Sequence, residues 1–307
     1  MTLDLRRLRY VHAIAQSGSL TRAADMLGVA QPALSHHLSE LEKYFGVPLF
    51  HRTPRGMVPT DVGHILAGQA GSILRSVEDA EAAVRNGVAT LAGSVSLGLL
   101  NTVALSLAVP LLQQCSERYP NIRLSIHEGT SQTLAKSMQK QELDLAVNLS
   151  EASEGSARLL ATERLVLAGR RDWDGVTDEI PLREALARPL ILPPREHIIR
   201  KLVEWAAHQQ DLRLDIRYEV AGGWTLKALV AAGLASTIIG RSAVTAEDLG
   251  NGLSIRPIVS PVLERRLVLV QSPMRATAPA VVAVSGLLQD LVVERSGDST
   301  WTASPHA

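Results

Sequence analysis

Apolar residues in the first 60 positions recur at the spacing of short amphipathic helices. The first stripe ends at Ser17-Gly18, where glycine can stop a helix and Ser19 can cap the next one. Pro32 opens a third helix, because a first helical turn does not need the N–H that proline lacks. The pattern predicts three helices and then a hairpin with strands at Pro48 to Arg52 and Met57 to Pro59.

The third predicted helix, Gln31 to Tyr44, has two distinct faces. At 100° per residue its leucines fall within about 40° of one another and form a buried stripe. His37 lies on the flank. The opposite side is polar, and we expect it to face solvent. The buried stripe consists of Leu34, Leu38, Leu41 and Phe45, and the polar side of Pro32, Ser35, His36, Ser39 and Lys43.

Asp61 to Leu91 lacks proline and keeps one apolar seam at spacings of three and four. A helix of this length spans roughly 45 Å, and an isolated apolar stripe needs a partner. Packing against its own domain is one interpretation, and we favour a homodimer seam. The seam residues are Val62, Leu66, Ala70, Ile73, Val77, Ala80, Val84, Val88 and Leu91.

Beyond Gly93 the pattern changes to alternating strands and helices, which predicts an α/β unit with a parallel sheet. A first series has strands at 95–100, 123–128 and 143–148 and helices at 106–119 and 130–140. A second series has strands near 164–169, 189–192, 216–220 and 236–240 and helices near 196–208 and 225–232. A strand at 265–270 and a helix at 279–293 could return the chain to the first lobe, and the polar tail is expected to fray.

This pattern divides the chain into four segments. We expect a helical head at 1–60, a linker helix at 61–92, a two-lobed unit at 93–295 and a flexible tail at 296–307. Lobe I would comprise 93–162 and 268–295, and lobe II 163–267.

Composition refines this picture. The formal net charge is +0, but basic residues outnumber acids in the first 60 positions, which leaves a basic N-terminal end. Cys115 is the one cysteine, so a disulfide framework is excluded and we interpret it as a core residue. The chain carries no signal-peptide pattern and no apolar run of membrane-spanning length, so a cytoplasmic protein without a membrane partner is expected.

Ser19 to Thr60 resembles the DNA-binding head of the LysR-type transcription regulators over essentially its full length. The resemblance implies a winged helix-turn-helix, a dimer-forming linker helix and a two-lobed effector domain like a periplasmic binding protein. The motifs that carry it are Ala23-Ala24, Gln31-Pro32-Ala33-Leu34-Ser35, Leu41-Glu42, Gly46-Val47-Pro48-Leu49-Phe50, Arg52-Thr53 and Thr60.

The resemblance assigns DNA contacts to this head. A polar helix can enter the major groove, where base edges differ, while neighbouring residues hold phosphates. The alternative is that Gln31 and His36 are exposed to water and contact no DNA. Gln31, Ser35 and His36 are expected to read bases, Pro32 and Ala33 to touch a thymine methyl, Arg52 and Arg55 to contact phosphate or the minor groove, and Thr21 and His37 to contribute further DNA contacts.

Two departures from the family pattern stand out. Ala30 replaces a common serine, so a side-chain helix cap of about 1 kcal/mol is missing unless another group supplies it. His36 and His37 replace a common Arg or Gln, so base preferences cannot be copied from relatives.

The effector site is expected between the lobes, where strands end and helix N-termini favour anions. For Thr130 and Ser131, helix capping is the alternative; Arg195 could instead pair with Glu196, and Trp224 could lie in the core. The resemblance to the family's cleft implies Asn101, Thr102, Thr130, Ser131, Arg195 and His197 as candidate residues, and Trp224 and Thr225, just before a predicted helix, are further candidates.

The expected partners are double-stranded promoter DNA, an anionic or polar small-molecule effector and a second copy of the chain, with a dimer of dimers and RNA polymerase as further candidates. No cofactor or metal is expected. Within the family, Gly18-Ser19-Leu20-Thr21 and Gly93-Ser94-Val95-Ser96-Leu97-Gly98 resemble the nitrogen assimilation control branch. Control of aromatic or organic-acid catabolism remains an alternative.

Two other classes of protein fit less well. A small-molecule binding protein without a DNA role leaves the head without a purpose. An enzyme lacks support, because the sequence contains no nucleophile elbow, phosphate loop or His-Glu-x-x-His pair.

Overall fold

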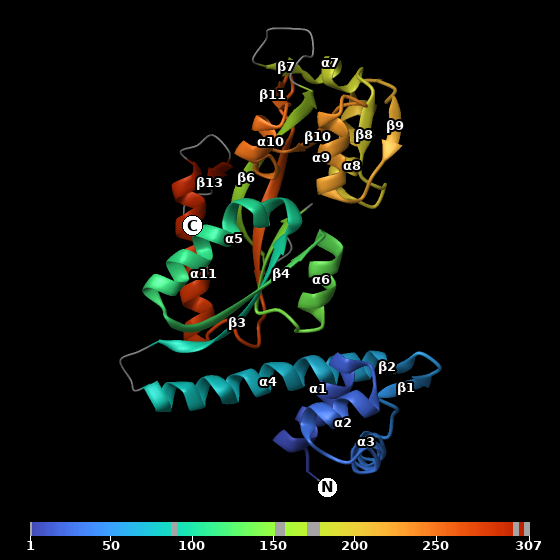
Figure 1. The fold of residues 1–307 in the computed structure, drawn as a ribbon, viewed down its shortest axis with the longest axis vertical. Helices are drawn as coiled ribbons and strands as arrows, with labels where there is room; N and C mark the ends of the chain where they lie inside the picture. The colour runs from blue at the N-terminus through green and yellow to red at the C-terminus, as the bar shows by residue number, and fades with distance from the viewer. Residues whose placement is uncertain (1, 87–90, 151–156, 171–178, 297–300, 304–307) are drawn as a thin grey trace.

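The computed structural model describes residues 2–86, 91–150, 157–170, 179–296 and 301–303. Three parts follow one another along the long axis: the N-terminal head with its long helix, then one α/β lobe, then a second (Figure 1). Each part encloses its own apolar cluster. The two-lobed α/β architecture with a helical winged head is confirmed.

The head has the predicted elements: α1 (Leu5–Ser17), α2 (Leu20–Leu27), α3 (Gln31–Phe45), β1 (Phe50–Thr53) and β2 (Gly56–Pro59). Asp4 and Ser19 cap the first two helices by accepting N–H groups three residues on. Gly18 lies in the left-handed region at φ 62°, so it ends α1 without the strain a side chain would cause. Leu34, Leu38 and Leu41 are buried as the leucine stripe predicts, whereas Phe45 remains exposed at the helix end.

Helix α4 (Asp61–Asn86) uses its seam in two ways. Its first half packs on α1, where Ala67 and Ala70 are buried. For this half of the helix, the interpretation that the seam packs against its own domain is confirmed. Further along, the seam turns outward, and Val84 is 84% exposed. The prediction that the helix reaches Leu91 is wrong, since β3 begins at the next residue; Val88 lies outside the described residues.

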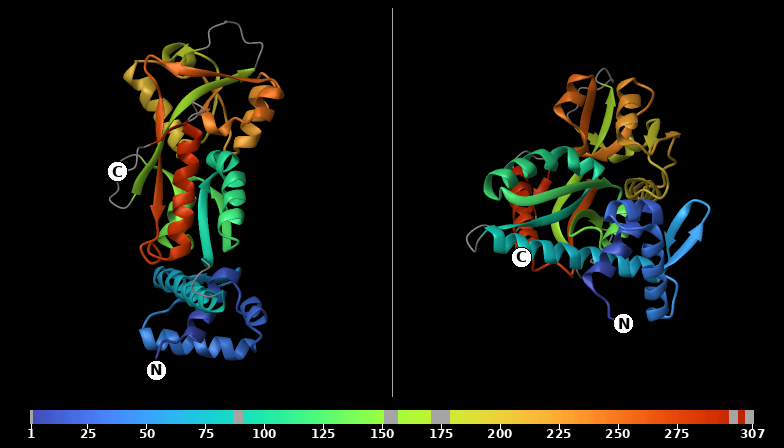
Figure 2. Two further views of the ribbon diagram at one scale, coloured as in Figure 1. Left: turned by 90° about the vertical axis from the view of Figure 1, so that its left-hand side faces the viewer. Right: turned by 60° about the horizontal axis from the view of Figure 1, so that its bottom comes forward.

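Lobe I is built on a parallel core of three strands in the order β4-β3-β5. Its helices cover the sheet, and α11 lies alongside α5 (Figure 2). Helix α5 begins at Asn101, five residues before the predicted start at 106. The prediction missed this start because the residue before the helix, Leu100, has no capping side chain that would mark it in the sequence. The elements are β3 (Ala92–Leu100), α5 (Asn101–Arg118), β4 (Asn121–Gly129), α6 (Ser131–Gln139), β5 (Leu145–Ser150), β12 (Glu264–Gln271) and α11 (Pro279–Ser296).

Within the residues that the structure describes, lobe II contains every strand and helix predicted for it and five further elements. Those not predicted are β7 (Ile180–Pro181), α7 (Leu182–Leu186), the 3-10 helix η1 (Arg241–Ala243), α10 (Ala246–Gly250) and β11 (Leu253–Val259). The predicted elements are the distal end of β6 (Ala157–Arg170), β8 (Leu190–Leu192), α8 (Ile198–Gln209), β9 (Ile216–Glu219), α9 (Gly223–Ala231) and β10 (Thr237–Gly240).

Strands β6 and β12 run antiparallel and join the two lobes. Leu160 and Ala161 belong to the lobe I core, and Leu165 and Leu167 to that of lobe II. Along β6, the boundary between the cores of the two lobes therefore lies near Glu163.

Residues 301–303 form β13, which pairs with the middle of β6. The expectation of a frayed tail is therefore wrong for these three residues, whose backbone joins the sheet.

A buried network of ions attaches α4 to lobe I. The Arg275 side chain, only 1% exposed, donates to a carboxylate oxygen of Asp79 on α4 and to Asp144 Oδ2 at 3.0 Å. Arg75 Nη2 donates to Asp144 Oδ1 at 3.4 Å. Backbone N–H groups of Ser94 and Ser96 complete the bonding of the two carboxylates. Helix α4 is thus held on the core of lobe I by paired charges as well as by apolar packing.

Among the described residues, none of the helices combines the length and apolar character required to cross a bilayer.

Candidate DNA interface and ligand cleft

The predicted polar face of α3 is open to solvent. Gln31, Pro32 and Ala33 are exposed at the N-terminal end, and the His36 side chain is 72% exposed one turn later. The expected lack of a side-chain cap at Ala30 is confirmed. The first N–H groups of the helix are therefore available to an external acceptor such as a phosphate.

The wing is joined to this face by one side-chain contact. Arg52 Nη2, on β1, donates to Ser35 Oγ at 3.1 Å. Ser35 is half-buried, whereas Arg52 and Arg55 are exposed. The contact holds the Arg52 guanidinium beside the polar face of α3, where it can reach a DNA backbone that lies along the helix.

Glu42 fixes the base of the wing, a role not predicted from the sequence. Its Oε1 accepts the backbone N–H groups of Leu49 and Phe50 at 2.8 and 3.2 Å. The acid in the Leu41-Glu42 pair therefore anchors the chain between α3 and β1.

His37 points toward α1 rather than away from the head. Its ring lies 5.3 Å from that of Tyr10, and its Nδ1 lies 3.4 Å from Glu40 Oε2. This hydrogen bond lowers the pKa of the Glu40 carboxyl below its ordinary value. The half-buried His37 thus has a packing role, and the geometry gives less support to its predicted DNA contact than to that of His36.

Thr21 is exposed in the first turn of α2. It is followed by Arg22, whose Nη2 donates to the carbonyl of Ser17 at 2.6 Å. The basic surface of the head therefore includes α2 as well as α3 and the wing.

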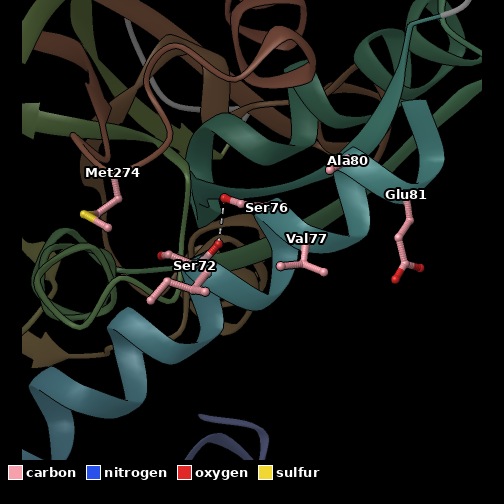
Figure 3. Close-up of a pocket in the computed structure, with 7 residues that line it drawn as sticks. Ser72, Ser76, Val77, Ala80, Glu81 and Met274 are labelled. Atoms are coloured by element: carbon pink, nitrogen blue, oxygen red, sulfur yellow. Dashed lines mark hydrogen bonds between the residues drawn. The ribbon is translucent and has the colours of Figure 1, made fainter. Parts of the chain in front are cut away.

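An apolar groove runs along the outward half of α4 (Figure 3). It encloses about 350 Å³, and Met274 of lobe I contributes one wall. The lining residues are Ser72, Ile73, Ser76, Val77, Ala80, Glu81 and Met274. Three of the predicted seam positions, Ile73, Val77 and Ala80, thus line an unfilled apolar surface.

A cleft between the lobes holds two adjoining chambers that share Thr130, Ser131, Leu149, His197 and Ala221. The less open of the two, called the enclosed chamber below, has a volume of about 390 Å³ and lies between the N-termini of α5 and α9. The other chamber, of about 660 Å³, lies beside α6 and α8 and is lined by Gln132, Asn148, Glu196 and Lys201 among others. Both volumes are in the range of small-molecule sites.

Six of the eight predicted effector residues line these chambers: Asn101, Thr102, Thr130, Ser131, His197 and Trp224. Arg195 and Thr225 line neither. Arg195 lies exposed in the turn before α8, and Thr225 is exposed in the first turn of α9. The prediction that these two side chains face the cleft is therefore not supported by the geometry.

Buried charges in the cleft wall were not predicted. Arg265 Nε donates to Glu163 Oε2 at 2.6 Å, and its Nη2 donates to Thr102 Oγ1 at 3.0 Å. The backbone N–H of Ser242 donates to Glu163 Oε1 at 2.6 Å. These bonds connect α5 of lobe I with η1 of lobe II across the strands that join the lobes.

Four helix N-termini meet at the cleft, and they differ in capping. Thr130 caps α6 in a reciprocal capping box, so the capping interpretation of Thr130 holds. His197 caps α8 by accepting the Ile199 N–H on Nδ1 at 3.2 Å. The caps of α5 and α9, Leu100 and Gly222, make no side-chain hydrogen bond, so these helices keep free N–H donors.

Burial lowers the pKa of the His197 imidazole below its ordinary value of 6.5, and the nearby Arg265 charge lowers it further. His197 is therefore neutral at pH 7. Among the described residues, no group of three or more His, Cys, Asp or Glu side chains could hold a metal ion.

Comparison with family models matches both parts of the chain. Residues 5–64 match "Bacterial regulatory helix-turn-helix protein, lysR family", and residues 89–292 match "LysR substrate binding domain". Among curated proteins, the nitrogen assimilation regulatory protein nac of Klebsiella aerogenes is 34% identical over 94% of this chain and 95% of that protein. The nac protein of Escherichia coli K12 is 35% identical over the same shares.

Solved structures show the same fold. A full-length OxyR variant from Pseudomonas aeruginosa covers 100% of both chains with a TM-score of 0.76 at 23% identity. Full-length CbnR complexed with its target DNA covers 95% of this chain and 99% of its own, with a TM-score of 0.64 at 23% identity.

Proposed function

Because the chain belongs to the LysR family of DNA-binding transcription regulators, we propose that it acts as a cytoplasmic homodimer whose α3 helices bind promoter DNA under the control of a small molecule in the interlobe cleft. The observation that carries the proposal is the polar face of α3, which is open to solvent while its leucines are buried. The family is one of regulators rather than of enzymes.

In the proposed DNA complex, α3 enters the major groove with its N-terminus leading. Gln31, Ser35 and His36 read base edges, and Pro32 and Ala33 contact thymine methyl groups. The wing residues Arg52 and Arg55 contact the backbone, and Thr21, His37 and the free N–H groups of α3 add further contacts. The exposure of the N-terminal end of α3 supports this arrangement.

The partner that we propose for the α4 groove is the same helix of a second copy. A dimer would bury Ile73 and Val77 against each other and remove the exposed Val84 from water. For the assembled complex, we further propose that two dimers associate and that the protein contacts RNA polymerase.

The cleft is proposed as the effector site, because two adjoining chambers there are lined by residues from both lobes. A ligand that touches both lobes can shift their relative position. An intramolecular disulfide switch is excluded within these 307 residues, since Cys115 is the one cysteine and it is buried.

Control of nitrogen assimilation genes is the regulatory role that we propose first, on the strength of the two nac relatives. Regulation of aromatic or organic-acid catabolism is the alternative. Transcript profiling of a deletion strain in nitrogen-limited medium and on aromatic acids distinguishes the two.

Sequence preference and general affinity should separate on substitution. His36→Ala should lower the affinity for the specific site by about 1–3 kcal/mol and leave nonspecific binding unchanged, because it removes a base contact. Arg52→Ala should weaken binding to every duplex. It should also reduce the slope of log affinity against log salt concentration by about one, because one phosphate contact is lost. Fluorescence anisotropy on specific and random duplexes measures both, and equal losses on the two duplexes for both variants would refute the division.

A gel shift on the DNA upstream of the chain's own gene tests the proposed function. A retarded specific complex that resists excess random DNA is expected. A binding protein or an enzyme without a DNA role would leave that fragment unshifted.

A further inference from the structure

Arg265 is a buried cation in the wall of the enclosed chamber and is only 4% exposed. Its Nε and Nη2 are engaged by Glu163 and Thr102. Within the described part of the chain, its third nitrogen, Nη1, forms no hydrogen bond. A guanidinium carries five N–H donors, so donors remain for a molecule in the chamber.

Free backbone donors flank this guanidinium. Arg265 is bonded to Thr102 in the first turn of α5, whose cap provides no side-chain acceptor. Gly222 and Gly223, at the equally uncapped start of α9, line the same chamber. An uncapped helix N-terminus carries a partial charge of roughly +0.5, so these two together offset about one negative charge.

The remaining charges leave no excess cation inside the chamber. Glu163 balances Arg265, and Lys227 Nζ donates to Asp248 Oδ2 at 2.5 Å and to the Ala243 carbonyl at 3.1 Å. His197 is neutral, and Glu128, which also lines the chamber, is exposed and solvated. A dianion such as phosphate would therefore bring a second, unbalanced charge out of water, which is costly.

Much of the rest of the chamber wall is apolar, although Asn101, Thr130 and Ser131 also line it. Trp224 lies on one side although it is 77% exposed overall. The aliphatic residues of the wall are Leu100, Leu105, Leu149, Ile199, Val220, Leu226, Ile238 and Ile239. Such a wall favours a hydrocarbon or aromatic body over a sugar or a polar metabolite.

We infer that the enclosed chamber binds an apolar monocarboxylate, with its carboxylate on Arg265 and the α5 N-terminus and its body against Trp224 and Ile239. The inference rests on the proposed function of the cleft as the effector site. It names Arg265, rather than the exposed Arg195, as the cation that recognises the ligand.

Thermal unfolding of the full-length protein tests the ligand class. The probes are benzoate, phenylacetate and 4-methylpentanoate, each with its primary amide, and inorganic phosphate. At least one acid should raise the Tm by several degrees and bind about 10- to 100-fold more tightly than its amide, the value of a charged hydrogen bond. Phosphate should leave the Tm unchanged. The inference would be overturned if the amides bound as tightly as their acids, if none of the acids bound, or if phosphate bound as tightly as the acids.

Two variants locate the site. Glu163→Gln with Arg265→Gln replaces the ion pair by a neutral hydrogen-bonded pair and should abolish the preference for acid over amide. Arg195→Gln, a matched change at an exposed arginine beside the cleft, should keep it. A double variant that retains the preference contradicts the assignment, and if that variant does not fold, the wild-type acid and amide comparison decides alone. Promoter binding of the wild type is measured in parallel: its absence refutes the proposed function, whereas intact DNA binding without acid preference refutes only the inference.

Discussion

Replacing Arg275 by methionine is expected to lower the free energy of unfolding of the chain by about 3–5 kcal/mol. The Arg275 side chain is 1% exposed, and its guanidinium bonds to Asp79, Asp144 and the Ser94 carbonyl. Its loss leaves two carboxylates facing each other with only backbone N–H groups and Arg75 as partners. Urea unfolding of the full-length protein, followed by circular dichroism, measures the change.

Arg85→Met provides the matched control for this prediction. Arg85 forms an exposed pair with Glu81 on the same linker helix, and such pairs contribute at most about 1 kcal/mol. Adding Asp79→Asn and Asp144→Asn to Arg275→Met should restore part of the lost stability, since no buried charge then lacks a partner. A loss for Arg275→Met no greater than that for Arg85→Met would show that the network does not stabilise the interface.

Introducing Ile73→Glu and Val77→Glu together should convert the protein from dimer to monomer and weaken operator binding by about 100-fold or more. Both side chains line the α4 groove, and carboxylates there would have to be buried against their copies in a dimer. Loss of the second head removes the avidity of two linked half-site contacts. Sedimentation at micromolar concentration and anisotropy on the promoter duplex measure the two effects.

Ile65→Glu is the control for the dimer prediction. Ile65 is an exposed apolar residue on the same helix, about 100° from the seam. It should leave the protein dimeric. A groove variant that sediments as a dimer would show that the copies meet at another surface.

The head could be predicted almost element by element, because its signals are local. Ser19 caps α2, Gly18 ends α1, and the leucine spacing of α3 selects the buried face. The long helix was harder to interpret, since one continuous seam serves two partners: Ala70 meets the head, whereas Val84 remains open. Apolar spacing specifies that a face is buried but not what covers it.

The ligand cleft could be predicted only in part. Thr130 and Asn101 follow strands, and the family resemblance together with that order predicts them at the cleft. The same reasoning predicts Arg195 there, but it lies exposed in the turn before α8. The cation that we propose for the ligand, Arg265, faces Glu163 in the register of β6 and β12, 102 residues away in sequence.

A local signal for Arg265 was nevertheless present. It stands at the buried parity of its strand, in step with Leu263, Leu267 and Leu269, while Arg266 alternates outward. A charged residue in a buried register requires a partner, and that requirement points to a site.

The central claim, that the polar face of α3 binds duplex DNA, is tested most directly by anisotropy of full-length protein on a labelled duplex from upstream of its own gene. The account predicts binding at least 1,000-fold tighter than to a scrambled duplex of equal length, the lower bound for specific regulators, and loss of that preference in a Gln31→Ala and His36→Ala variant. Equal affinity of the wild type for the two duplexes, or a variant that still discriminates between them as the wild type does, would contradict it.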